Sequence, residues 1–299
     1  MASRLCALQV QDPRATTFDL LISLFVAASY IPQVIRIVND HRGSAGISGW
    51  YIVLLTTSAS AHLAVRLNSL SSSVAWKCFR QGELQGFDAF SSLVVYLQAS
   101  VQWVAAIILF GVYAALRNDT YQTGSPSTTA ALAIVVTHAA ILLPSALYLL
   151  KQLTEDEYTI FTLLLHASYA ILVQTTGLLT SLSAFIPPIK LMLAHSRDAV
   201  PVSQGNISTL GLGLQVIAWI CLACSQAVRM RPLPPHDTSG LFPPLTPWSV
   251  KWWFQILFER GQAAGWLALA GSQLVVLCVA LRLGGLGDRQ IQLKLLLSS

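Results

Sequence analysis

Charged residues are scarce in this chain. They make up 10% of its 299 residues, whereas hydrophobic residues make up 54%, and an ordinary soluble domain carries about 25% charge. Because so few charges cannot cover a water-exposed surface, the composition argues against a soluble globular protein. The formal net charge of +5 is spread along the chain without a basic stripe, which argues against nucleic-acid binding and favours attraction to anionic lipid headgroups.

Motifs for catalysis, metals and cofactors are also missing. Cys221 and Cys224 form a CxxC pair inside an apolar run, with no second pair and no histidine at ligand spacing, so we expect them to be packing residues. The chain has no HExxH, GxSxG or phosphate loop. We expect no Asp or Glu within a span, and Glu259 stands next to Arg260, where an ion pair is the simpler account. The sequence thus predicts no enzyme activity, no metal and no cofactor.

Long apolar blocks are what the chain does contain. Each has about 20 residues, the length at which a helix crosses a hydrocarbon core of about 30 Å. They predict an all-α membrane protein with seven transmembrane helices. These are Phe18–Val38, Gly46–Val65, Phe90–Leu116, Thr129–Leu150, Leu172–Leu193, Ile207–Val228 and Gln262–Leu283. Phe161–Val173 can lengthen the fifth helix, and the aromatic-rich Trp248–Phe258 suits the membrane interface. Basic residues are balanced between the two sides, so the positive-inside rule leaves the orientation open.

A proline motif occurs twice in the chain. Tyr30-Ile31-Pro32-Gln33 recurs in altered form as Phe185-Ile186-Pro187-Pro188, and the same shift of 155 positions aligns Arg42 with Arg197 and Ser48 with Ser203. With the helix at Thr129–Leu150 between them, two three-helix repeats would run parallel in the membrane. The predicted divisions are a polar N-terminal tail (1–17), a first repeat (18–116), a linker-helix region (117–160), a second repeat (161–283) and a C-terminal tail (284–299).

The first motif resembles the signature of a known family. Ser29-Tyr30-Ile31-Pro32-Gln33, followed by Arg42-Gly43-Ser44-Ala45-Gly46-Ile47-Ser48, is similar to the PQ-loop repeat proteins, relatives of the SWEET sugar facilitators, lysosomal amino-acid exporters and the KDEL receptor. The context Gly46-Ile47-Ser48-Gly49-Trp50-Tyr51 is most similar to a fungal branch of the family. The resemblance implies a transporter of a small polar solute (amino acid, sugar or related metabolite) in a vacuolar, lysosomal or other endomembrane. A homo-oligomeric assembly is left open.

The prolines suggest how such a transporter would move. A proline inside a helix removes one backbone donor and clashes with the carbonyl four residues earlier, so the helix kinks there. We therefore expect hinges of alternating access at Pro32, Gln33, Pro187 and Pro188, although prolines that only shape packing are the alternative.

Polar residues inside the spans are the candidate solute contacts, because burying them in a membrane is costly. They form stripes at helical spacing on the third, sixth and seventh spans: Ser91, Gln98 and Gln102; Gln215, Trp219 and Gln226; Gln262, Trp266 and Gln273. Hydrogen bonds between helices are the alternative account of these stripes.

Proton coupling would need a titratable group near the path. The candidates are Asp40, just beyond the first motif, and the span histidines His62, His138 and His166. Two other function classes stay open: a sorting receptor of the KDEL-receptor type, against which the scarcity of intramembrane Arg and Lys counts, and a membrane-embedded enzyme of a metabolite pathway.

Overall fold

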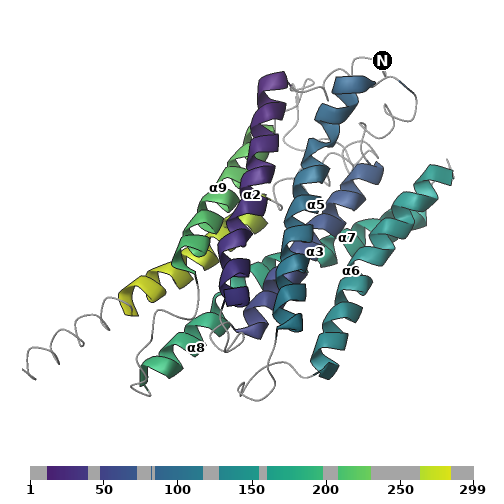
Figure 1. Cartoon of the computed structure of the whole chain (residues 1–299). Coiled ribbons are helices and arrows are strands. Elements are labelled where there is room, and N and C mark those ends of the chain that lie inside the picture. Colours follow the sequence, from purple (N-terminus) through teal and green to yellow (C-terminus); the bar gives the residue numbers. More distant parts are fainter. Residues whose placement is uncertain are drawn as a thin grey trace, which may run out of the picture.

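The structure is a computed structural model, and it describes residues 12–39, 48–72, 82, 85–116, 128–154, 160–197, 208–229 and 263–283. Within these ranges the chain forms helices and short turns, with no strand. The labelled helices are α2 (Pro13–Asn39), α3 (Gly49–Ser72), α5 (Gly86–Ala115), α6 (Thr128–Thr154), α7 (Ile160–Ser183), α8 (Ile186–Arg197) and α9 (Thr209–Arg229) (Figure 1). The helix Ala263–Leu283, yellow in Figure 1, is called the C-terminal helix below.

Five segments of the described chain are long and apolar enough to cross a membrane: Pro13–Asn39, Gly86–Ala115, Ala167–Ala194, Thr209–Ala227 and Ala263–Leu283. The prediction of an all-α, multi-span membrane protein is therefore confirmed at this level. Each predicted span overlaps a helix of the structure, but the fifth, Leu172–Leu193, is divided between α7 and α8 by a turn. Two others, Gly46–Val65 and Thr129–Leu150, fall on α3 and α6, which are not among the five segments, so seven transmembrane helices stay a prediction. Helix α7 begins at Ile160, as the extension of the fifth span predicted. Trp248–Phe258 lies outside the described residues.

Helix α3 is not among these five segments, and its surroundings explain why. It packs against α5, α6 and α7, and nearly all its side chains from Tyr51 to Arg66 are buried. A helix covered by protein needs no continuous apolar surface, so α3 can carry Ser58, His62 and Arg66 in its interior.

The side-chain pattern is the reverse of that in a soluble protein. Large apolar side chains point outward on the peripheral helices, as for Leu24 on α2, Leu172 on α7 and Leu210 on α9. Glutamines and serines are buried among the apolar side chains of the interior, including Gln102 and Gln215, which have no exposed surface. An apolar exterior around a polar interior is the arrangement that a lipid environment favours.

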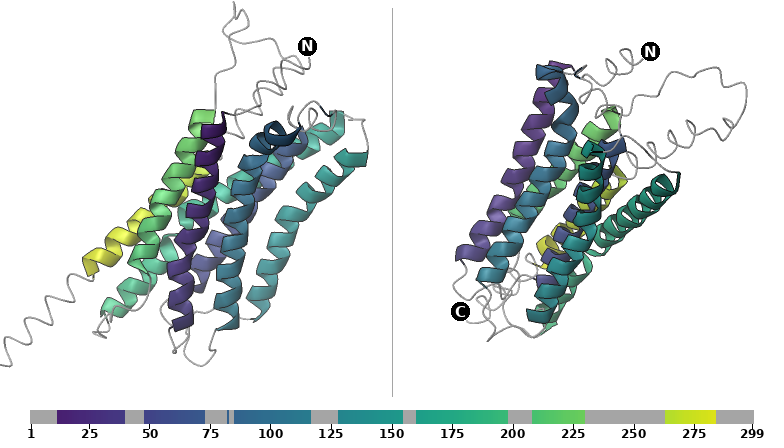
Figure 2. Two further views of the ribbon diagram at one scale, coloured as in Figure 1. Left: turned by 45° about the horizontal axis from the view of Figure 1, so that its top comes forward. Right: turned by 90° about the vertical axis from the view of Figure 1, so that its right-hand side faces the viewer.

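The neighbours of each helix define the bundle. Helix α5 packs against both α2 and α3, while α2 packs on its other side against α9, and α3 packs against α7. Helix α6 packs against α3 and lies at the edge of the bundle, as the views in Figures 1 and 2 agree. The C-terminal helix reaches the interior through Trp266 and Leu269, which join the buried cluster of Tyr30 and Trp219.

The two proline motifs differ in structure. Helix α2 continues through Pro32 to Asn39, so the chain stays helical at the first motif. The hinge expected there stays a prediction. The second motif does break the chain, because α7 ends at Ser183, Ala184 and Phe185 form a turn, and Pro187 and Pro188 lie in the first turn of α8. Proline is tolerated in a first turn, where its missing N–H has no intrahelical partner to lose.

A polar interior as the candidate functional site

One polar cluster joins three helices in the interior. Gln273 Nε2 of the C-terminal helix donates to the Tyr51 hydroxyl of α3 at 2.6 Å, and this hydroxyl lies 3.5 Å from Oε1 of Gln215 on α9. All three side chains are at most 2% exposed. The structure thus brings together two of the predicted path residues, Gln215 and Gln273, through a tyrosine that the sequence analysis did not select.

A second group lies in the same buried cluster. The rings of Tyr30 on α2 and Trp219 on α9 meet edge to face, with centroids 6.2 Å apart. Neither the Tyr30 hydroxyl nor the Trp219 indole N–H has a hydrogen-bond partner among the described residues, and the same holds for the Nε2 groups of Gln102 and Gln215. These four buried groups, called the donor set below, come from α2, α5 and α9.

Trp266 of the C-terminal helix links the donor set to α3. Its indole N–H donates to Gln102 Oε1 at 3.1 Å, so these two predicted path residues are in direct contact. The His62 imidazole stacks on the Trp266 ring, with centroids 5.9 Å apart, and the Arg66 guanidinium lies 5.7 Å from the ring centroid. Arg66 is 5% exposed, so the bundle does contain a buried arginine, contrary to our placement of Arg66 beyond the end of a span.

Asp19 corrects the expectation that no acidic residue lies within a span. It lies on α2, is 3% exposed, and accepts hydrogen bonds from Gln98 Nε2 on α5, at 3.4 Å to Oδ1, and from the Ser225 hydroxyl on α9. Gln98 Nε2 also donates to the Asp19 carbonyl oxygen at 3.1 Å. A buried carboxylate thus joins three helices, and Gln98, a predicted path residue, is one of its donors.

Gln33 of the first proline motif has a defined partner. Its side-chain amide pairs with the backbone of Ser208, with Nε2 3.4 Å from the Ser208 carbonyl and Oε1 3.5 Å from the Ser208 N–H. The Ser208 hydroxyl accepts from Gly211 N–H at 3.0 Å, the bond of an N-cap at the start of α9. Any side chain at position 211 would contact Gln33, because a Cβ on Gly211 would lie 3.2 Å from Gln33 Cγ.

The remaining residues predicted for the solute path and for proton coupling lie apart from the donor set or outside the described residues. Ser91 is buried and donates to Asp88 O of its own helix, and Gln226 is buried on α9. His138 lies on α6, where Nδ1 is 3.4 Å from the Ser60 hydroxyl of α3. This places His138 at the α3–α6 contact rather than beside the donor set. Asp40 and Gln262 lie outside the described residues, as does the side chain of His166.

Several residues of the interior were not selected from the sequence. Asp19 was detectable as an acid following the first residue of a predicted span, which marks a functional candidate by default. Arg66 was missed because α3 extends to Ser72 rather than ending at Val65. Tyr30 belongs to the first proline motif, and nothing local in the sequence distinguishes a tyrosine that faces the interior.

Comparisons with protein-family models, with curated proteins and with solved structures give no match to this chain.

Proposed function

We propose that the protein is a transporter that moves a small polar solute across the membrane by alternating access. The observation that carries the proposal is the donor set: the Tyr30 hydroxyl, the Trp219 N–H and the Nε2 groups of Gln102 and Gln215. A buried donor without a partner costs about 1–3 kcal/mol. A bundle that used these residues only for packing would gain stability by replacing them with apolar ones, and acceptor oxygens of a solute are the partners that such donors would take.

The helix contacts support a two-repeat transporter plan. In the first half the third helix, α5, packs against both α2 and α3. Across the halves, the first helix of one repeat meets the second helix of the other, as α2 meets α9 and α3 meets α7–α8. A twofold axis that relates two parallel repeats would superpose one of these helix pairs on the other, and several transporter folds have this arrangement.

The starts of the second helices refine the repeat. Ser48 directly precedes α3 and Ser208 directly precedes α9, and these positions are 160 residues apart. The shift of 155 therefore fits the proline motifs, whereas Ser48 corresponds to Ser208 rather than to Ser203. In this proposal the loop after the proline motif is five residues longer in the second repeat.

The two tyrosines of the interior provide a matched test. Both are 2% exposed, but the Tyr30 hydroxyl has no partner among the described residues, whereas the Tyr51 hydroxyl bonds to Gln273. Tyr30→Phe should leave the melting temperature of the solute-free protein unchanged or raised, and should abolish solute uptake into reconstituted vesicles. Tyr51→Phe should lower the melting temperature, because Gln273 Nε2 loses its acceptor.

The uptake assay would screen radiolabelled amino acids, sugars and carboxylic acids, with and without a pH gradient. Full uptake by Tyr30→Phe for every solute that the wild type carries would sink the role of the donor set. A wild type that carries none of them would refute the transporter itself.

A sorting receptor remains a second candidate, because one observation favours it. Arg66 is a buried cation inside the bundle, and a receptor for a peptide carboxylate needs such a charge. Binding of a peptide with a free carboxyl terminus, together with no uptake of any solute, would favour the receptor.

A further inference from the structure

Helix α6 contains a proline away from its ends. Pro144 has no N–H, so the carbonyl of Ala140, four residues earlier, loses the donor that an α-helix would give it. An unpaired carbonyl is costly among apolar side chains, and α6 exposes Leu143 and Leu147 next to the proline. The bundle therefore needs to supply a donor at this point of α6.

Tyr169 of α7 supplies this donor. Its hydroxyl donates to the Ile141 carbonyl oxygen and lies 3.4 Å from the Ala140 carbonyl oxygen. A tyrosine hydroxyl carries one proton, which here serves the two neighbouring carbonyls on the N-terminal side of Pro144. The contact of Tyr169 with these carbonyls, called the α6 clasp below, thus takes the place of the N–H that proline lacks.

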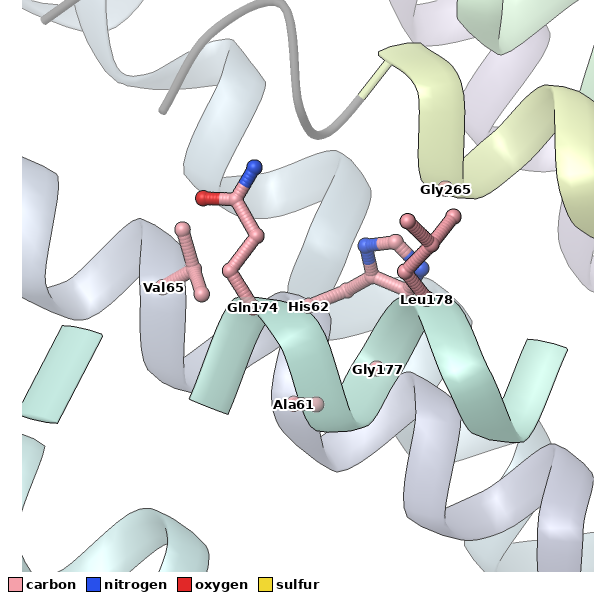
Figure 3. A pocket seen from close by; sticks show the side chains of 7 residues that line it. All are labelled: Ala61, His62, Val65, Gln174, Gly177, Leu178 and Gly265. Carbon is pink, nitrogen blue, oxygen red and sulfur yellow. The ribbon is translucent and has the colours of Figure 1, made fainter. Parts of the chain in front are cut away.

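Helix α7 is a fixed support for the clasp, because it lies directly on α3. A Cβ on Gly177 would lie 2.9 Å from the Ala61 Cβ, and Figure 3 shows these two residues side by side. One turn beyond Tyr169, Val173 is buried in the same apolar cluster as Ile141 and Ala61. Tyr169 therefore reaches α6 from a helix whose position is set by close packing on α3.

The part of α6 before the proline is attached to α3 as well. His138 Nδ1 lies 3.4 Å from the Ser60 hydroxyl, which accepts the Trp103 indole N–H of α5 at 3.1 Å. Pro144 follows His138 along α6, at the point where the helix lacks an internal hydrogen bond. A helix bends more easily at such a point, and α6 follows a curved path in the left view of Figure 2. The clasp thus lies where bending of α6 would begin.

We propose that the α6 clasp is a positioning device, which stiffens α6 at Pro144 and fixes this helix against α7. Tyr169 is its positioning residue: with the hydroxyl in place the freed carbonyls have a donor, and without it α6 opens at the proline. The inference goes beyond the proposed function, because α6 links the two predicted repeats, whereas the donor set comes from α2, α5 and α9. One hydroxyl thus limits how far the linker between the repeats bends.

Hydrogen–deuterium exchange of the purified protein in detergent, read by mass spectrometry, tests the clasp without any solute. Tyr169→Phe removes the donor and keeps the ring, so amides of the α6 segment 141–150 should exchange about threefold to tenfold faster. Tyr30→Phe is the matched control, because the Tyr30 hydroxyl has no partner among the described residues. It should leave exchange in α6 as in the wild type.

Pro144→Ala supplies the background that separates a clasp from ordinary packing. Alanine restores the backbone N–H toward the Ala140 carbonyl, so this carbonyl no longer depends on the tyrosine. In that background Tyr169→Phe should change exchange in segment 141–150 by no more than about twofold. A tyrosine that only packs against α6 would give the same acceleration in both backgrounds.

The outcomes decide the proposal. Unchanged exchange in Tyr169→Phe, or an equal acceleration with and without the proline, would overturn the clasp. An acceleration that Pro144→Ala suppresses, confined to α6, would uphold it. If Tyr169→Phe alone does not fold, recovery of folded protein on adding Pro144→Ala would uphold the clasp, and failure of the double variant as well would overturn it. None of these results depends on solute uptake.

Discussion

Gly177 offers a quantitative test of the packing between α3 and α7. Two methyl carbons normally pack about 3.5–4.0 Å apart, but a Cβ on Gly177 would lie 2.9 Å from the Ala61 Cβ. Overpacking of this kind costs about 1–3 kcal/mol, while alanine in place of a helical glycine gains about 1 kcal/mol. Gly213→Ala on α9 should show only the gain in helix stability, because a Cβ there meets no heavy atom within 4 Å outside its own helix backbone. Gly177→Ala should therefore be about 1–3 kcal/mol less stable than Gly213→Ala.

The partner residue makes this test specific. Ala61→Gly removes the methyl group that Gly177→Ala would strike, so the double variant should recover most of the loss, with a coupling free energy of about 1–3 kcal/mol. The free energy of unfolding can be measured by titrating the protein from mild detergent into sodium dodecyl sulfate and following tryptophan fluorescence. Equal stability of Gly177→Ala and Gly213→Ala, or additive effects in the double variant, would show that α3 and α7 do not meet at these residues.

Two further predictions concern contacts between the halves. Gln33→Leu removes both bonds to the Ser208 backbone and should lower the free energy of unfolding by about 1 kcal/mol in the same titration. The control Ile35→Leu lies on the exposed face of the same helix and should leave the free energy of unfolding unchanged. Equal free energies of unfolding for the two variants would contradict the contact between Gln33 and Ser208. Asp19→Asn keeps a side-chain acceptor for Gln98 and Ser225 and should melt within a few degrees of wild type. Asp19→Ala removes that acceptor and should melt at a lower temperature, and equal melting temperatures for the two variants would contradict these contacts.

The helices were predictable because the length of each apolar block decides where they form. A block of about 20 apolar residues has few alternatives to a membrane-spanning helix, and each predicted span overlaps a helix of the structure, with the fifth divided between α7 and α8. The ends were less predictable, because a helix can extend beyond the apolar block wherever protein covers it. Helix α3 shows this, since its last residues include Arg66 and Asn68, both of which are buried.

The interior was predictable only in part. Helical spacing identified the buried glutamines, because two residues seven apart share a face whatever that face meets. It gave no information about partners on other helices. Gln98 meets Asp19, which is 79 positions away, and Gln215 meets Tyr51, which is 164 positions away. Such pairs depend on which helices are neighbours, and the order in which α2, α5 and α3 pack is set by the whole bundle rather than by any one segment.

The proline motifs now have different physical roles in the two halves. In the first, Gln33 is buried and its amide holds the start of α9, so α2 is fastened to the other half while remaining one helix through Pro32. In the second, the corresponding residue is Pro188, which has no side-chain donor, and the chain instead breaks at Ala184 and Phe185. A helix break leaves backbone groups without intrahelical partners and makes bending there easier than in an unbroken helix. If the bundle opens and closes, bending therefore concentrates between α7 and α8, while opening at the first motif requires the Gln33–Ser208 pair to separate.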